Sequence, residues 1–406
     1  MKYVNSLKYM RSFETSVAPS DISSVRASEL CELLGRININ TKSIFIPAGA
    51  AGHATAVMLE SVIKSEGYRV GRITSEFGFD CRKMVYIDAT QASIEDFNRA
   101  VAELKAKITS VPDKQFLAEE VAFALSLLLC RMCDCKYIIF EGMSCEDYDL
   151  ASLCAPYDIV IVPEIREEDE KTLAVISKAV LHSPRAIVSA NQKINVYNKL
   201  SSVARTGINL TAKKDFEIKH LSSIRLDFSY GSRDGYSIKT PSLIARECAM
   251  LVIDTAQAIR RDGVKVQWSN IESGLASAVG TLAFDTFSVS PLMLFDGAAD
   301  EYEVSALKAT MEETLGAVSL EGLSICVPAS AIDRIAQFDG VDTLIIVGDA
   351  DCEPSFAQVQ NTVFCKDIKS AAKQLKNNIK DCKNTVVFGS VAFATELRDC
   401  LIGLTL

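Results

Sequence analysis

The feature that most constrains the fold is a regular alternation of short apolar runs with helical patterns. The apolar runs are of strand length and include IFIP (44–47), YRVGRIT (68–74), YIIFEG (137–142), YDIVIVPEI (157–165) and AIVSAN (186–191). Helical patterns separate them, among them residues 55–66, 93–108, 116–132 and 169–182. Strands that alternate with helices in this way indicate βαβ units, so we predict an α/β fold with a largely parallel sheet.

The pattern changes at residues 207–240, where β-type alternation predicts a small antiparallel patch before a helix at 242–261. A second α/β series begins near Leu292, and GTLAFDTFSVS (280–290) is the expected connection. We therefore predict two domains. The larger covers residues 1–285, and a smaller C-terminal α/β domain covers residues 286–406.

Charge and composition exclude several functional classes. The chain has 406 residues and a formal net charge of -9, which disfavours nucleic acid and anionic membranes as partners. No stretch has the ~18 uncharged apolar residues of a membrane span, and we expect a cytoplasmic protein. The 13 cysteines are odd in number and scattered, unlike a secreted disulfide framework.

The one cysteine cluster is CRMCDC, with Cys130, Cys133 and Cys135. It has the composition of a soft-metal site, but no second Cys or His pair with zinc-like spacing follows. The favoured interpretation is therefore the end of a buried helix, SLLLCRM, that leads into the strand KYIIFE.

The stretch SIFIPAGAAGHATAVMLE (43–60) has the layout of a phosphate-binding loop: a strand, a glycine-rich turn and a helix start. Gly49 and Gly52 would let backbone N–H groups converge on phosphate oxygens, and the Thr55 hydroxyl would reach magnesium. His53 stands where such a loop has its lysine, and it has a shorter reach and less charge at neutral pH. An ordinary strand-to-helix turn is the alternative interpretation.

Several stretches, taken together, resemble the folylpolyglutamate synthase and dihydrofolate synthase family of the Mur ligase superfamily. YVNSLKYMRSF (3–13) is similar to the opening helix of the family, and AGAAGHAT (48–55) stands for its loop AGTNGKGS. GYRVGRITSEFG (67–78) is similar to GYRVGLFTSPHL, LMLFDGAAD (292–300) to ILDGAHN, and VVFGSVAFATELR (386–398) to VVTGSLYLVGEVR. These matches run in the same order along nearly the whole chain.

The resemblance implies a P-loop-type, mostly parallel central domain and a smaller Rossmann-like domain. It also implies an ATP-dependent ligase that phosphorylates a carboxylate of a folate-like substrate and joins an amino acid, commonly glutamate, to it. The implied cofactors are ATP and magnesium. The implied site residues are Thr55, Ser75, Glu141 and Asp169 for magnesium, Lys178 as a carbamate with Glu141 in catalysis, and Gly49, Gly52, His53, Thr55 and Asp296 for the nucleotide.

The departures from the family fall where the chemistry needs charge. The loop lysine is His53, an arginine at the domain connection aligns with Thr281, and TSPH has become TSEF, with Glu76. The loop threonine and asparagine are Ala50 and Ala51, and the histidine and asparagine of DGAHN are Ala299 and Asp300. Arg72, Lys83 and Arg166 are the basic residues that we expect could replace the lost charge.

Two hypotheses follow from these departures. The favoured one is a pseudoenzyme that keeps the ligase fold to bind a small molecule or a protein partner, with weakened or lost catalysis. The alternative is an active ATP-dependent amide ligase on folate or another carboxylate, with rewired phosphate contacts. Removing one well-placed transition-state donor typically costs ~2.7–4 kcal/mol, so the loss of several favours the first.

Overall fold

The computed structural model describes residues 2–13, 24–35, 41–74, 81–112, 114–143, 155–165, 170–205, 208–211, 215–261, 263–316, 322–338, 340–348 and 359–405. The chain forms two compact units. The first comprises Met1–Ala48, Leu59–Thr211 and Ile253–Gly274, and the second comprises Gly49–Met58, Ala212–Val252 and Leu275–Leu406. Among the described helices, none combines the length and the apolar character that crossing a bilayer requires.

The first unit is built on an eight-stranded sheet in the order β4-β3-β2-β5-β1-β6-β7-β8. Its strands are β1 (Lys42–Pro47), β2 (Val70–Thr74), β3 (Val85–Ile87), β4 (Thr90–Gln91), β5 (Tyr137–Met143), β6 (Ile159–Val162), β7 (Ala186–Ser189) and β8 (Ile208–Thr211). All neighbours pair in parallel except β3 and β4 at one edge. The prediction of a largely parallel sheet is confirmed, and β8 belongs to it rather than to the antiparallel patch.

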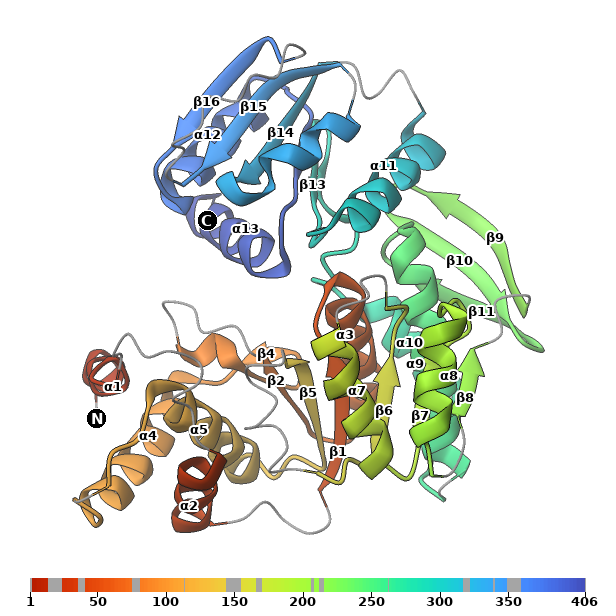
Figure 1. Cartoon of the computed structure of the whole chain (residues 1–406). Helices are drawn as coiled ribbons and strands as arrows, with labels where there is room; N and C mark the ends of the chain where they lie inside the picture. Colours follow the sequence, from red (N-terminus) through yellow and green to blue (C-terminus); the bar gives the residue numbers. More distant parts are fainter. Residues whose placement is uncertain are drawn as a thin grey trace. The chain divides into compact units, whose positions relative to one another are not determined.

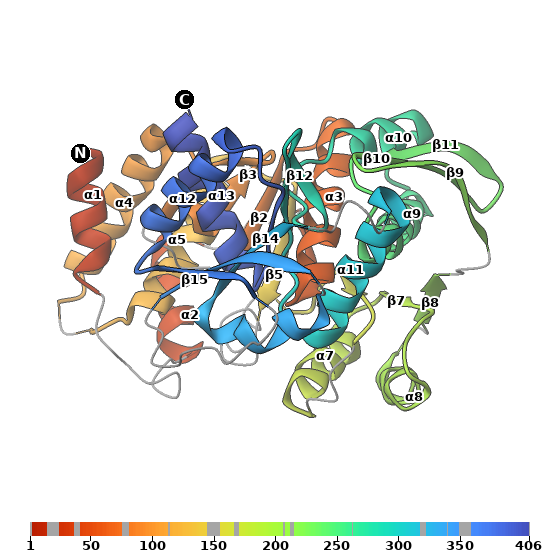
Figure 2. The same cartoon turned by 90° about the horizontal axis from the view of Figure 1, so that it is seen from above.

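Helices cover this sheet. The first unit contains α1 (Tyr3–Arg11), α2 (Ser24–Leu34), α4 (Ile94–Thr109), α5 (Ala118–Met132), α7 (Glu170–His182) and α8 (Ile194–Val203). Figures 1 and 2 show α1 beside α4. Buried side chains of α2, α4, α5 and α7 share one core with the strands. The predicted helix at 93–108 is confirmed as α4, whose N-cap Ser93 accepts a hydrogen bond from the Asp96 N–H.

Three helices belong in part to each unit: α3 (Ala50–Ser65), α9 (Leu243–Arg261) and α10 (Trp268–Ser277). The α3 helix begins five residues before the predicted start at residue 55. The alanines of AAGHATA favour helix, and the His53 N–H already donates to Gly49 O at 2.9 Å. Most of the glycine-rich stretch is therefore the first turns of a helix rather than an open loop.

The second unit contains the antiparallel patch that the sequence predicts. Strands β9 (Phe216–Ser222), β10 (Arg225–Tyr230) and β11 (Arg233–Ile238) form a sheet in the order β11-β10-β9. Aromatic rings cross the strands: Phe228 stacks on Phe216 with ring centroids 4.8 Å apart and on Tyr236 at 5.5 Å. Such cross-strand pairs stabilise a small sheet.

The rest of the second unit is a six-stranded sheet in the order β12-β13-β17-β14-β15-β16. Its elements are β12 (Asp285–Val289), β13 (Leu292–Phe295), α11 (Glu301–Leu315), β14 (Leu323–Pro328), η6 (Ala329–Gln337), β15 (Val341–Val347), β16 (Asn361–Cys365), α12 (Ile368–Lys380), β17 (Thr385–Val387) and α13 (Val391–Thr405). Only β12 pairs antiparallel. Thus a second, smaller α/β fold is confirmed, while the domain boundary at 285 stays a prediction.

The cysteines at the end of α5 pack into the core of the first unit. Cys130 and Cys135 are buried, and both sulphur atoms lie against Gly71 in the central strand β2. The predicted helix end that leads into a strand is confirmed, since α5 ends at Met132 and β5 begins at Tyr137.

Adding a methyl group at Gly71 tests this packing. A Cβ atom there would lie 2.4 Å from Cys130 Sγ and 3.4 Å from Cys135 Sγ. We expect Gly71→Ala to lower the free energy of unfolding by about 1–3 kcal/mol because overpacking forces side chains and backbone to shift. Chemical denaturation measures the loss, and adding Cys130→Ala should restore part of it. Gly403→Ala, where a new Cβ meets no atom within 4 Å, is the control; an equal loss there would contradict the packing.

Candidate functional site

The start of α3 presents little open loop. Ala48 and Gly49 are exposed, and Gly49 has a φ of 112°, which favours glycine over residues with a side chain. From Ala50 onward the backbone is helical, and Gly52 is buried within the first turn. The N–H groups at this helix start form a site that favours anions, because they have no partner inside the helix.

The anion at this helix start comes from the chain itself. Glu303, in the first turn of α11, accepts a hydrogen bond from the Ala50 N–H through Oε1 at 3.1 Å. Its other oxygen, Oε2, accepts from the Ala299 N–H at 2.7 Å. Burial raises the pKa of Glu303, and the backbone hydrogen bonds oppose this shift. Glu303 was not among the predicted site residues, since an acidic residue in a first helical turn is an ordinary sequence feature.

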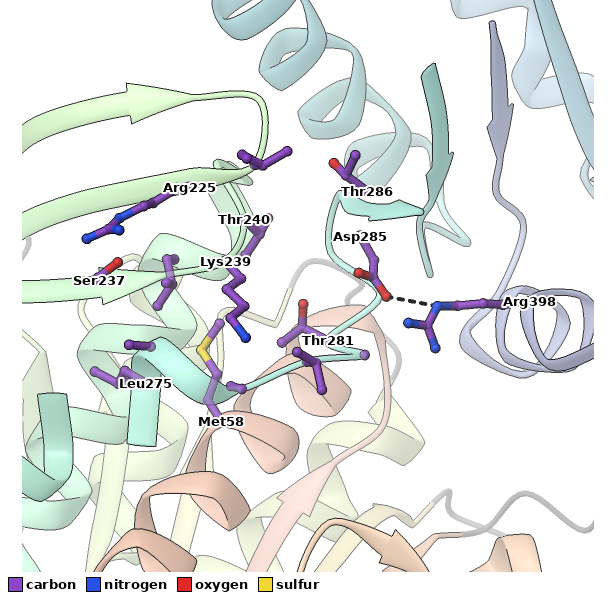
Figure 3. A pocket seen from close by; sticks show the side chains of 16 residues that line it. Met58, Arg225, Ser237, Lys239, Thr240, Leu275, Thr281, Asp285, Thr286 and Arg398 are labelled. Atoms are coloured by element: carbon purple, nitrogen blue, oxygen red, sulfur yellow. Dashed lines mark ion pairs between the residues drawn. The ribbon is translucent and has the colours of Figure 1, made fainter. Parts of the chain in front are cut away.

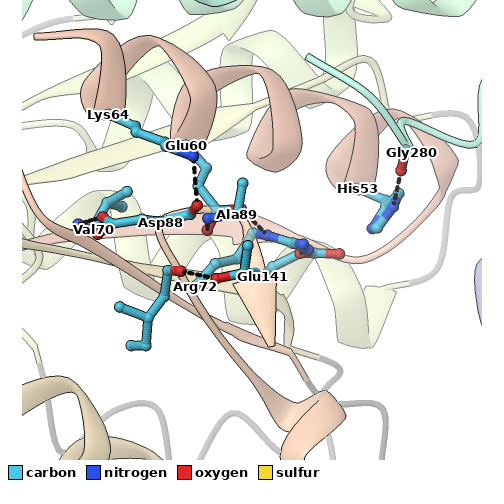
Figure 4. A network of polar contacts seen from close by, with 11 residues as sticks. His53, Glu60, Lys64, Val70, Arg72, Asp88, Ala89, Glu141 and Gly280 are labelled. Carbon is cyan, nitrogen blue, oxygen red and sulfur yellow. Dashed lines mark hydrogen bonds and ion pairs between the residues drawn. The ribbon is translucent and has the colours of Figure 1, made fainter. Parts of the chain in front are cut away.

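His53 also has a partner within the second unit. Its Nε2 lies 3.0 Å from the backbone oxygen of Gly280 (Figure 4). A carbonyl oxygen only accepts, so Nε2 carries the proton and donates it. The side chain is 9% exposed. His53, which stands at the position of the phosphate-loop lysine, therefore links α3 to the segment before β12 by a hydrogen bond.

Thr55 is fully buried one turn further along α3. Its hydroxyl donates to the Ala51 backbone oxygen at 2.7 Å, and the Cys248 thiol donates to the same oxygen at 3.3 Å. This is a common helical use of a threonine hydroxyl.

Asp296 organises the turn between β13 and α11. It accepts hydrogen bonds from the Phe284 N–H at 2.7 Å and the Ala298 N–H at 2.8 Å. Burial raises the pKa of Asp296 to about 7, although these two N–H groups oppose the shift and Glu303 adds to it. Both carboxylate oxygens of Asp296 are therefore hydrogen-bonded to backbone N–H groups of the protein.

A buried ionic network surrounds Glu141 in the first unit (Figure 4). Arg72 donates to Glu141 through Nη1 and to Glu60 through Nε, the latter at 2.7 Å, and its guanidinium lies 4.2 Å from the centroid of the Tyr86 ring. Burial lowers the pKa of Arg72, but the carboxylates of Glu141 and Glu60 outweigh burial and raise it. Glu60 also accepts a hydrogen bond from the Ala89 N–H at 2.7 Å. Arg72 therefore neutralises charge at the predicted magnesium ligand Glu141.

The other predicted site residues lie apart from these contacts or outside the described residues. Lys178 is exposed on α7, and Lys83 lies in the short helix η2 (Cys81–Met84). Ser75, Asp169 and Arg166 lie outside the described residues, as does Glu76. Within the part of the chain that is described, no group of three or more His, Cys, Asp or Glu side chains is arranged to hold a metal ion.

The fit of a nucleotide to this geometry is poor. A phosphate at the start of α3 would compete with the Glu303 carboxylate for the Ala50 N–H and would meet its negative charge. A magnesium ion at Glu141 would compete with Arg72. The described residues do not fit a bound nucleoside triphosphate with magnesium in this arrangement.

No protein-family model matches the sequence, and no curated protein sequence matches it. Solved structures match over nearly the whole chain. A folylpolyglutamate synthetase from Lactobacillus casei has a TM-score of 0.77 at 16% identity and covers 99% of this chain and 100% of its own. Folylpolyglutamate synthase from Thermotoga maritima has a TM-score of 0.78 at 18% identity, with 98% and 96% covered.

FolC from E. coli, in complex with DHPP and ADP, has a TM-score of 0.73 at 16% identity and covers 100% of this chain and 99% of its own. The chain therefore has the α/β fold of the folylpolyglutamate synthases. This confirms the fold that the sequence resemblance implies.

Removing the cation of the buried network tests its role. We expect Arg72→Met to lower the free energy of unfolding by about 3–5 kcal/mol, because it removes the buried cation that pairs with both Glu60 and Glu141. Paired carboxylates suit hard divalent cations, so Mg²⁺ or Ca²⁺ should restore part of the stability of the variant. Chemical denaturation with and without the cation measures both effects.

The matched control is Arg26→Met. Arg26 pairs with buried Glu120 at 2.7 Å, which is the one carboxylate with which it pairs among the described residues. It should lose stability and recover none with a divalent cation. Strong stabilisation of the unmodified protein by Mg²⁺ would contradict the network, because it would mean that the ion displaces Arg72.

The raised pKa of Asp296 predicts a pH-dependent stability. The folded state holds a proton up to about pH 7 that the unfolded state releases near its ordinary value of 3.8. The contribution of Asp296 to stability is therefore full at low pH, falls as pH rises through this window and stays constant above it. Relative to Asp296→Asn, the unmodified protein should lose up to about 4 kcal/mol across the window. Urea denaturation of both at several pH values measures this, and parallel pH profiles would refute it.

Proposed function

We propose that the chain is a folylpolyglutamate synthase-like protein in which ATP-dependent ligation is weakened or lost. In such ligases ATP phosphorylates a substrate carboxylate, and an amino group attacks the acyl phosphate to form an amide. The protein's part in that chemistry is to position the reactants and neutralise charge. The observation that carries the proposal is the Glu303 carboxylate on the Ala50 N–H at the start of α3.

Glu303 has an entropic advantage over a phosphate in binding the Ala50 N–H. It is part of the chain, so its carboxylate pays no entropy of association, unlike a free nucleotide. It is held in place by a second hydrogen bond, from the Ala299 N–H. A phosphate must therefore displace an anion that is already hydrogen-bonded. It must also bind without the lysine that the family has at the position of His53.

Two further contacts support loss of catalysis. His53 donates to the Gly280 backbone oxygen, so its ring is committed to a contact within the protein. Arg72 pairs with Glu141, so the carboxylate that the family resemblance assigns to magnesium already has a cation. The first contact occupies the side chain at the position of the phosphate-binding lysine. The second occupies the carboxylate that the resemblance assigns to magnesium.

The proposed class of ligand is taken from solved structures that share this fold. Structures of this fold include complexes described as FPGS-AMPPCP-folate and as FolC with DHPP and ADP. We propose a cytoplasmic protein that binds a folate-like or other carboxylate, or an amino acid, and that has a protein partner if it does not catalyse. An active ligase with rewired phosphate contacts is the alternative outcome of the test below.

Calorimetric titration with Mg-ATP, and with a non-hydrolysable analogue, tests the proposal. We expect the unmodified protein to show no binding at about 1 mM nucleotide, a concentration that corresponds to about 4 kcal/mol of binding free energy. Glu303→Gln removes the charge at the Ala50 N–H and keeps the shape of the side chain. Since a hydrogen bond to a charged group contributes about 1.5–3 kcal/mol, this variant should gain about tenfold or more in affinity.

Glu301→Gln is the matched control. Glu301 is an exposed acid in the same first turn of α11, so the variant changes the net charge equally without touching Ala50. It should bind as weakly as the unmodified protein, and His53→Lys should add affinity only together with Glu303→Gln. Micromolar binding by the unmodified protein would overturn the proposal in favour of an active ligase. An equal gain in both glutamine variants would show a general charge effect instead.

A further inference from the structure

The second unit contains a cavity of about 540 Å³ to which neither Glu303 nor Asp296 contributes. Its walls come from the β10–β11 hairpin, the last residues of α10, the segment that leads into β12, and Arg398 on α13 (Figure 3). Small-molecule sites usually have volumes of about 300–1,000 Å³. The cavity therefore has the size of a ligand site.

The lining is cationic although the chain as a whole is acidic. Arg225, Lys239 and Arg398 line the cavity, and among the described residues that line it Asp285 is the one carboxylate. Arg398 pairs with Asp285 at 3.2 Å, and Arg225 pairs with Asp227 at 2.7 Å. These two pairs leave the charge of Lys239 in excess, although the chain has a net charge of -9.

Lys239 is the cation that is available to a ligand. Within the described residues its ammonium forms no ion pair or hydrogen bond, and the side chain extends toward the part of the cavity lined by Met58 and Thr281 (Figure 3). Thr281 is itself buried and places a hydroxyl donor in the same cavity. An ammonium and a hydroxyl together suit a single carboxylate, whereas a phosphate dianion would need cations that Asp285 and Asp227 already neutralise.

The rest of the lining is apolar. Met58, Ile238 and Leu275 are buried at the cavity wall. Two further lining residues, Ile224 and Val279, are large hydrophobic residues left 48% and 61% exposed. Covering such surface is favourable by about 25 cal/mol per Å². A ligand with an apolar body would gain this energy while its charged end remained near Lys239.

We propose that this cavity binds a small organic carboxylate with an aromatic or branched aliphatic body. The carboxylate accepts hydrogen bonds from Lys239 and Thr281, and the body covers the exposed apolar surface of Ile224 and Val279. The ligand leaves the Arg398–Asp285 and Arg225–Asp227 pairs intact. This proposal does not rest on the proposed function, since it requires neither a nucleotide nor catalysis.

Calorimetry or ligand-observed NMR on the full chain tests this, with naphthoate as the probe and naphthamide as its neutral counterpart. Naphthoate should bind, and naphthamide should bind about tenfold more weakly because it lacks the charge that pairs with Lys239. Lys239→Gln should weaken naphthoate binding about tenfold and leave naphthamide unchanged. Val279→Trp should weaken both, since the exposed position of Val279 lets the larger side chain enter the cavity without disturbing the core.

Lys369→Gln is the matched control, because Lys369 is an exposed lysine on α12 that does not line the cavity. It should bind naphthoate as the unmodified protein does. The proposal is overturned if naphthoate does not bind, if naphthamide binds equally well, or if Lys239→Gln and Lys369→Gln behave alike. Unchanged thermal unfolding of Lys239→Gln, which alters an exposed side chain, shows that the loss concerns the ligand.

Discussion

The hydrogen bond from the Ala50 N–H to the Glu303 carboxylate determines what the start of α3 can bind. The free N–H groups at a helix start attract an anion whatever its source. In a phosphate-binding loop that anion is the ligand, whereas here it is a side chain from the first turn of α11. Glu303 also accepts from the Ala299 N–H, so one carboxylate joins two helix starts of the second unit. The charge needed to hold α3 and α11 in place is the charge that would repel a nucleotide.

The other polar contacts follow the same rule, that a buried polar group needs a partner. Asp296 accepts hydrogen bonds from the Phe284 and Ala298 N–H groups. His53 donates to the Gly280 backbone oxygen, and Arg72 forms an ion pair with Glu141. Each contact lies within one unit, and each occupies a residue at a position that the family resemblance links to nucleotide or metal. The chain has the fold, and these side chains make contacts within the protein.

Much of the fold could be predicted from the sequence, and less of the site. Strands such as IFIP and the helix after Ser93 carry their signals in hydrophobic periodicity and capping, which are local. The glycines of AGAAGHAT predict an open turn, but its alanines favour helix, and α3 begins at Ala50. Arg72 was expected to replace lost phosphate charge, but neither its contact with Glu141 nor that of Glu303 with Ala50 could be predicted. These partners lie 69 and 253 residues away in the chain, and no local pattern records such contacts.

The most direct measurement is the amide NMR signal of Ala50 in the full chain during a titration with Mg-ATP. If the Glu303 carboxylate holds this N–H, the signal should not move with nucleotide, and it should move when Glu303 is replaced by glutamine. A signal that shifts with Mg-ATP in the unmodified protein and reaches saturation below about 1 mM, a dissociation constant worth about 4 kcal/mol, would contradict the account. It would mean that a phosphate displaces Glu303 and that the start of α3 still works as a nucleotide site.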